Sequence, residues 1–64
     1  MHNKRNENYT VVSGVLTIEL EDQVLKLHEG ESYNIESNTM HLLRNDTDED
    51  IILIEVDTGD EINE

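Results

Sequence analysis

The sequence predicts an all-β fold, a single small antiparallel barrel of about six short strands. Val, Ile, Leu, Tyr and Thr cluster in short runs, and turn-forming residues separate these runs at intervals of about 8 to 12 residues. Helical periodicity is nearly absent. This even spacing is typical of a β-sandwich or barrel and argues against alternating strands and helices. With 64 residues the chain has room for one domain, which we assign to residues 1–64.

Six runs are predicted as strands, and every connection between them has the length of a hairpin loop. In chain order the predicted strands are residues 8–12, 15–21, 24–28, 32–35, 40–44 and 51–57. The connections are rich in Gly, Asn, Asp and Ser, which tolerate tight or left-handed backbone. They fall at residues 13–14, 21–23, 29–30, 36–39 and 46–49.

The second and third predicted strands each have one apolar face. Leu16, Ile18 and Leu20 alternate with Thr or Glu, and Leu25 and Leu27 repeat the pattern. Because successive side chains of a strand point to opposite faces, we expect these leucines and the isoleucine to be buried and the residues between them to face solvent.

The last predicted strand is different, because residues 51–54 are apolar on both faces. Such a strand has one side toward the core and the other toward a second sheet or subunit, so this run is the predicted dimer contact. On alternation, Glu55 shares a face with Ile51 and Leu53. We expect its carboxylate either at the barrel rim in water or pointing into the cavity.

The small size of the chain predicts a partner surface. A domain of about this length buries only about 60% of its unfolded surface, so its own core is marginal. There is no cysteine to form a disulfide or a thiolate zinc site. A metal held by His and carboxylates or, most simply, homodimerisation through exposed strand edges would supply the missing stability.

The charge balance excludes several classes of partner. Sixteen acidic residues against four basic ones give a formal net charge of -12. That field repels nucleic-acid phosphates and anionic membrane surfaces, so we expect neither partner. The chain has no long apolar span and no apolar stretch behind its polar start of the kind a signal peptide needs, so we expect a soluble cytoplasmic protein.

Residues 30–45 resemble the second motif of the cupin superfamily, G(X)5PXG(X)2H(X)3N, with its spacing intact. Gly30, His41 and Asn45 match the motif, while Glu36 and Asn38 replace the usual Pro and Gly. Asn is among the few residues that adopt the left-handed conformation at low cost, so it is a suitable replacement for that Gly.

Residues 2–14 resemble the end of the first cupin motif, G(X)5HXH(X)3,4E(X)6G. They are also similar to the H-H-H-R-x-E-H-W-x-V-V-S-G run of the type II mannose-6-phosphate isomerase barrels, which also occur fused to mannose-1-phosphate guanylyltransferases. The residues that agree directly with that run are Arg5, Glu7, Val11, Val12, Ser13 and Gly14. Residues 54–56 and 59–60 resemble the closing I-E-V and G-D of that family, so the likeness covers nearly the whole chain.

The resemblance implies a minimal cupin-type, jelly-roll-like barrel with a divalent transition metal (Zn, Mn, Fe or Ni) inside it. By correspondence the ligands are His2, Glu7 and His41, and the family's fourth ligand position falls before Met1. Two imidazoles and one carboxylate with open positions form a sensible site for such metals. The alternatives are that His41 is a packed remnant of a lost metal site and that Glu7 is a solvated strand residue.

The resemblance further implies a small sugar or sugar phosphate as ligand. Binding a phosphate needs cations, for which Arg5 and Arg44 are the candidates. Isomerisation needs a base and a metal that polarises the carbonyl, and Glu55 is the candidate catalytic base if it points inward. A non-catalytic ligand-binding module and a structural dimeric barrel without metal are the alternatives. Convergence of Glu7 and His41 in the interior would favour metal or ligand binding, whereas aliphatic side chains there would favour the structural barrel.

Overall fold

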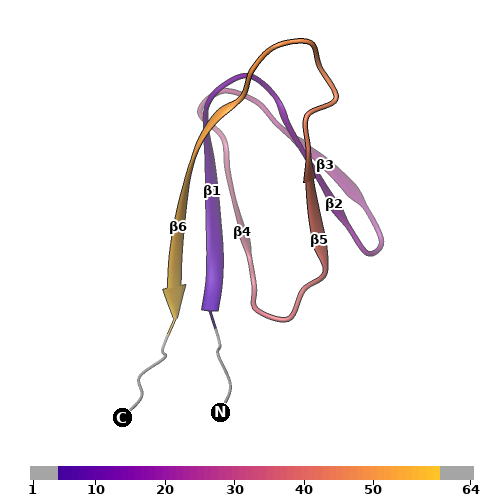
Figure 1. Cartoon of the computed structure of the whole chain (residues 1–64). Coiled ribbons are helices and arrows are strands. Elements are labelled where there is room, and N and C mark those ends of the chain that lie inside the picture. The colour runs from indigo at the N-terminus through magenta and orange to yellow at the C-terminus, as the bar shows by residue number, and fades with distance from the viewer. Residues whose placement is uncertain (1–4, 60–64) are drawn as a thin grey trace.

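The structure, a computed structural model, describes residues 5–59 and is all-β, as predicted (Figure 1). The six strands are β1 Arg5–Ser13, β2 Leu16–Leu20, β3 Val24–Leu27, β4 Ser32–Ile35, β5 His41–Arg44 and β6 Ile52–Gly59. Each predicted strand is present with small shifts at its ends, and β4 agrees residue for residue. No helix capable of crossing a membrane occurs in the described range.

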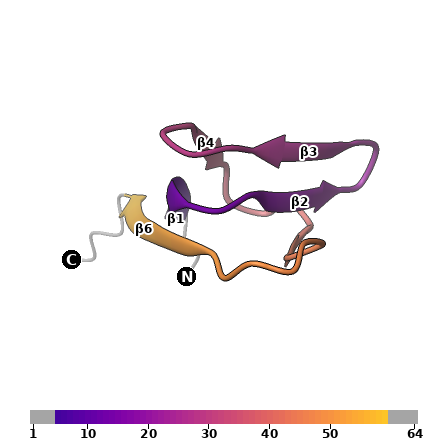
Figure 2. The ribbon, with the colours of Figure 1, turned by 90° about the horizontal axis from the view of Figure 1, so that it is seen from above.

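The strands form two antiparallel three-stranded sheets, with the orders β4-β1-β6 and β3-β2-β5 (Figures 1 and 2). Among the described strands, only β2 and β3 are consecutive in the chain and paired with each other. The other short connections carry the chain between the sheets. This arrangement is compatible with a small jelly-roll-like barrel.

Gly14 is where the chain leaves the first sheet for the second, and only glycine fits there. Its φ is +92°, in the region that side chains disfavour. A Cβ at this position would lie 2.7 Å from the backbone oxygen of Asp50 and 3.1 Å from the Cα of Ile51. The β1–β2 connection therefore passes directly against the chain that leads into β6.

The core lies between the two sheets and draws on both. Its buried side chains are Tyr9, Val11, Leu16, Ile18, Leu27 and Ile35. Partly buried residues packed against it are Leu20, Leu25, Tyr33, Ile51 and Leu53. The alternation predicted for β2 and β3 is therefore confirmed for their apolar positions.

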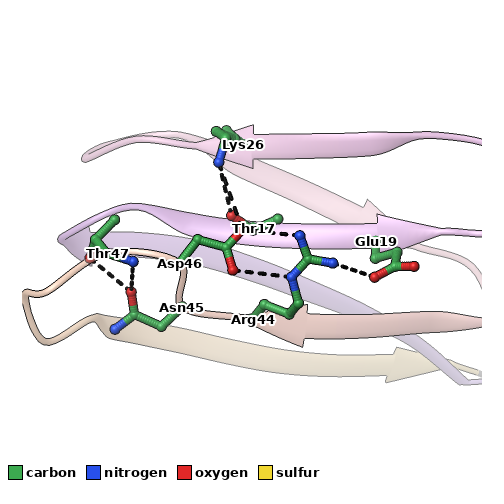
Figure 3. Close-up of polar contacts among 7 residues, drawn as sticks. All are labelled: Thr17, Glu19, Lys26, Arg44, Asn45, Asp46 and Thr47. Atoms are coloured by element: carbon green, nitrogen blue, oxygen red, sulfur yellow. Dashed lines mark hydrogen bonds and ion pairs between the residues drawn. The ribbon is translucent and has the colours of Figure 1, made fainter.

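The prediction that the other face of β2 is solvated is wrong at Thr17, which is 1% exposed. A polar network on the outer face of β3-β2-β5 covers it (Figure 3). Arg44 donates hydrogen bonds to both carboxylate oxygens of Asp46, at 3.1 and 3.0 Å, and contacts Glu19. Lys26 lies 3.4 Å from the Thr17 hydroxyl and 4.0 Å from Asp46. Long side chains from three strands thus bury a residue that a strand's alternation places in water.

Ionic contacts in this network displace the pKa values of its partners. The guanidinium of Arg44, through its hydrogen bonds first, lowers the pKa of Asp46, and the same hydrogen bonds raise the pKa of Arg44. Both groups are at the surface, where such pairs contribute little to stability.

Two asparagines of the second motif shape loops. Asn38 has a φ of +66°, which confirms the left-handed conformation expected at that motif position. The Asn45 amide donates to the carbonyl of Glu49 at 2.8 Å, and its oxygen accepts from the backbone N–H of Thr47 at 2.9 Å (Figure 3). The Asn at the end of the motif therefore closes the loop that leads toward β6.

Candidate functional site

Polar side chains gather at one end of the space between the sheets, where β1 begins and β6 ends. The antiparallel register of these strands pairs Val11 with Leu53, Tyr9 with Glu55, and Glu7 with Asp57. Directly opposed residues point to the same face of a sheet. The inward row of each strand therefore changes from aliphatic to carboxylate toward this end.

Glu7 meets His41, which comes from β5 of the other sheet. The imidazole Nε2 lies 3.2 Å from a Glu7 carboxylate oxygen, and the two side chains are about a quarter and a third exposed. The other ring nitrogen, Nδ1, lies 3.0 Å from the backbone oxygen of Thr39. A carbonyl only accepts, so Nδ1 carries a proton. In the neutral imidazole the Nε2 lone pair then faces the carboxylate.

That geometry suits a cation. A neutral imidazole and a carboxylate repel when their lone pairs face each other, unless a second proton or a metal ion lies between them. Metal-binding histidines almost always donate the remaining ring N–H to a carbonyl or carboxylate, as His41 does to Thr39. The donor set of Glu7 and His41 therefore fits a divalent metal.

Tyr9 orients Glu7, and sequence reasoning did not identify it. Its hydroxyl donates to the Glu7 carboxylate at 2.6 Å, and its ring lies 6.4 Å from that of His41. Tyr9 is 4% exposed. Burial, followed by the hydrogen bond to Glu7, raises the pKa of Tyr9. The alternation of Glu7, Tyr9 and Val11 along β1 was the signal that could have revealed it.

Two further carboxylates, Glu55 and Asp57, lie beside Glu7. Each of the three offers an oxygen within 4.8 Å of the others. A hydrogen bond with Asp57, followed by partial desolvation and the repulsion of Asp57, raises the pKa of Glu55. Both β6 residues are exposed. Glu55 thus belongs to the row of β6 side chains that faces the space between the sheets, and it lies at the open rim of that space. Its position combines the two that were expected, at the rim in water and pointing inward.

Two hollows adjoin His41. The smaller has a volume of about 150 Å³ and is lined by Glu7, Ile35, Glu36, Ser37, Asn38, Thr39 and His41. The larger, of about 360 Å³, is lined by Glu19, Leu20, Glu21, Met40, His41 and Leu42. The smaller hollow has the size of a small polar ligand and contains the pair of Glu7 and His41.

The structure brings some of the predicted site residues together and separates others. Glu7, His41 and Glu55 share the polar end. Arg44 lies across the sheet, on the outer face of β3-β2-β5, in contact with Glu19 and Asp46 (Figure 3). His2 and the side chain of Arg5 lie outside the described part; Arg5 begins β1, opposite Gly59.

Comparisons with known proteins agree on one family. The profile described as "Mannose-6-phosphate isomerase C-terminal" matches residues 1–64. A mannose-1-phosphate guanylyltransferase of Salmonella muenchen is 37% identical over 59 residues, which cover 92% of this chain and 12% of that protein. The chain thus spans about an eighth of the length of that curated relative. No solved structure matches it.

Proposed function

The chain belongs to the mannose-6-phosphate isomerase C-terminal family, and we propose that it is a cupin-type domain that binds a divalent metal and a small sugar or sugar phosphate. The family membership confirms the resemblance found in the motifs and points to a function connected with sugar phosphates. The observation that carries the proposal is the contact of 3.2 Å between Glu7 and His41 beside a small hollow.

Glu7 and His41 are the proposed metal ligands, with His2 as a third from the start of the chain. Thr39 and Tyr9 hold the two described ligands in position through their hydrogen bonds. The carboxylates of Glu55 and Asp57 each offer an oxygen within 4.8 Å of Glu7, in a group that does not include His41, so their proposed role is to bind the water of the metal. Ligands of the imidazole and carboxylate types suit Mn, Fe or Zn.

A bound metal would polarise a sugar carbonyl or a hydroxyl next to it. Glu55, at the rim and beside Glu7, is the proposed base that moves a proton between adjacent carbons. Its neighbour Asp57, through a hydrogen bond first, raises the pKa of Glu55, which makes the carboxylate a better base. Isomerisation of a sugar phosphate is therefore the proposed reaction if the domain is an enzyme.

A second candidate function is ligand binding without turnover. It is favoured by the positions and ionic partners of the basic side chains. Among the described side chains the cations are Lys26 and Arg44, and both contact Asp46 on the outer face of β3-β2-β5. Arg44 would have to leave Asp46 and Glu19 to reach a phosphate in the hollow. Recognition of a phosphate then depends on Arg5 and on the metal.

The test is calorimetric titration of the metal-free chain with Mn²⁺ and Zn²⁺, using His41→Ala and Glu7→Gln as variants. His28→Ala is the matched control, because His28 is an exposed histidine in the turn after β3. We expect one metal per chain in the unsubstituted protein and the control, and an affinity lower by at least about tenfold in the two variants. Circular dichroism checks that each variant folds.

Equal affinity in His41→Ala and His28→Ala would contradict the metal site. If the metal binds, isomerisation of mannose 6-phosphate by the metal-loaded chain and by Glu55→Gln separates the two candidates. Turnover that Glu55→Gln abolishes supports the enzyme, whereas saturable sugar-phosphate binding without turnover supports the binding module.

A further inference from the structure

The outer face of the β4-β1-β6 sheet carries no charged side chain among the described residues of its three strands. Its outward residues, including Val12 in the bulge of β1, are Asn6, Asn8, Thr10, Val12, Ser32, Asn34, Ile52, Ile54 and Val56. At the chain's charged fraction of 31%, nine positions would carry about three charges. A surface that faced only water would be expected to share the charge of the rest of the chain.

The β6 side of this face is apolar and open. Ile52, Ile54 and Val56 are 57%, 53% and 49% exposed, and Val12 beside them is 43% exposed. β6 is also an edge strand of eight residues, paired with β1 alone in the described part. Natural proteins usually protect such an edge strand with charges or proline. The charges of β6, Glu55 and Asp57, point to the opposite face.

We propose that this face is a contact between two copies of the chain, related by a twofold axis. The outward row of β6 and the neighbouring Val12 form the centre of the contact, and the Asn, Thr and Ser side chains of β1 and β4 form its rim. A depleted charge at the centre and a polar rim are the usual composition of such an interface. A twofold contact brings the same face of both copies together.

The charge of the chain is the reason for choosing a second copy as the occupant. Each copy carries a formal net charge of -12, so two copies repel each other wherever their carboxylates meet. The described strands of the uncharged face offer a surface through which two copies can meet without placing strand carboxylates in contact. A basic partner would instead be drawn to the acidic surfaces.

The size of the face sets the expected strength. β6 has 8 residues, so at about 3.3 Å per residue and about 4.8 Å between strands the face measures about 26 by 14 Å. The two copies together would bury about 700 Å² of flat area, which is below the standard size of about 1,200 to 2,000 Å². We therefore expect a weak, concentration-dependent dimer that salt strengthens, because salt screens the repulsion between the copies.

The dimer contact is independent of the proposed metal and sugar site. Glu7 and His41 meet on the inner side of the β4-β1-β6 sheet, while the contact uses its outer side. A chain that binds metal but stays monomeric at about 1 mM would overturn this inference and leave the proposed function intact. A chain that forms the dimer but binds no metal would support this inference and contradict the proposed function.

Sedimentation equilibrium of the 64-residue chain over a range of concentrations, at low and high salt, tests the contact. Ile54→Asp is the variant and Val24→Asp is its matched control, because both parent residues are 53% exposed and Val24 lies on β3 of the other sheet. We expect the dissociation constant to rise by at least about tenfold in Ile54→Asp and to stay near that of the unsubstituted chain in Val24→Asp. A monomer at about 1 mM, or equal weakening in both variants, would overturn the proposal.

A spin label locates the contact without disturbing its charge. The chain has no cysteine, so Ile54→Cys and Val24→Cys can each be labelled at one place. At concentrations where the dimer sediments, we expect dipolar broadening between labels at position 54 and none at position 24. The opposite pattern would assign the dimer to the other sheet and refute the proposal. Circular dichroism confirms that the labelled chains fold.

Discussion

The space between the two sheets has an apolar end and a polar end, and β1 and β6 contribute residues to both. At the apolar end Val11, Leu16 and Ile18 are at most 2% exposed. At the polar end Glu7 and His41 are about a third and a quarter exposed and lie beside further carboxylates. The difference teaches that the buried apolar core and the proposed binding site lie at opposite ends of β1. The apolar end holds the fold together, whereas the polar end keeps repelling groups close to each other.

The largest expected effect is at the apolar end. Ile18→Ala removes a side chain that is 0% exposed and should lower the free energy of unfolding by about 2–5 kcal/mol. Chemical denaturation monitored by circular dichroism measures the loss. Val24→Ala, at a position 53% exposed, should change stability by less than about 0.5 kcal/mol. Equal losses in the two variants would mean that the apolar end is not the stabilising core.

The next effect concerns the connection between the sheets. Gly14→Ala must place a Cβ 2.7 Å from the Asp50 oxygen at a φ of +92°, so we expect a loss of about 1–3 kcal/mol. Gly30→Ala is the control, since Gly30 has a similar φ of +86° but no atom within 4 Å of the added Cβ. Urea denaturation of both variants separates steric crowding from backbone strain. A larger loss in Gly30→Ala would disprove the close approach at Gly14.

Tyr9 joins the two ends, because its ring is in the core and its hydroxyl contacts Glu7. Tyr9→Phe keeps the ring and should cost about 0.5–1.5 kcal/mol through the lost hydrogen bond. The same variant should weaken metal binding, since Glu7 would no longer be held toward His41. Tyr33→Phe, at a partly buried tyrosine in β4, is the control. Metal affinity that is unchanged in Tyr9→Phe would show that the hydroxyl has no part in positioning Glu7.

The smallest effect has the opposite sign and belongs to the polar end. Asp57→Asn removes a charge beside Glu7 and Glu55, so the metal-free chain should become more stable by a few tenths of a kcal/mol at neutral pH. Metal affinity should fall at the same time. Ser37→Ala, at a neutral residue lining the hollow, is a control that alters no charge. Destabilisation of the metal-free chain by Asp57→Asn would show that the hydrogen bond between Glu55 and Asp57 outweighs the repulsion among the carboxylates.

The pH dependence follows from the sign of the Glu55 shift. Its pKa in the folded chain is above the ordinary value of 4.5, so the folded state binds more protons than the unfolded state just above pH 4.5. The contribution of Glu55 to stability therefore rises as the pH falls into that window and is lost as the pH rises through the folded pKa. Asp57→Asn should flatten this dependence, which thermal unfolding at several pH values measures. An unchanged profile would contradict the coupling of the two carboxyl groups.

Sequence patterns anticipated the strands and part of the site. The resemblance to the two cupin motifs implied that His41 and Glu7 meet, and the replacement of the motif Gly by Asn38 anticipated a left-handed residue at φ +66°. The first expectation came from the family likeness, and the second from the residue type at one position. Thr17 was beyond such patterns, because the side chains that bury it include Lys26 and Arg44 of neighbouring strands. Tyr9 contacts Glu7 of its own strand, so the alternation along β1 could have revealed it.

The amino-acid sequence by itself determined the all-β class, the positions of the turns and the apolar faces of β2 and β3, because these follow from local propensity and from the period of two along a strand. Only the tertiary structure decided that most short connections cross between sheets, that Arg44 is engaged by Asp46, and that Asp57 joins Glu7. The physical reason is that the choice of which strands pair depends on burying the apolar faces of both sheets at the same time. No single strand carries the information that places β1 between β4 and β6.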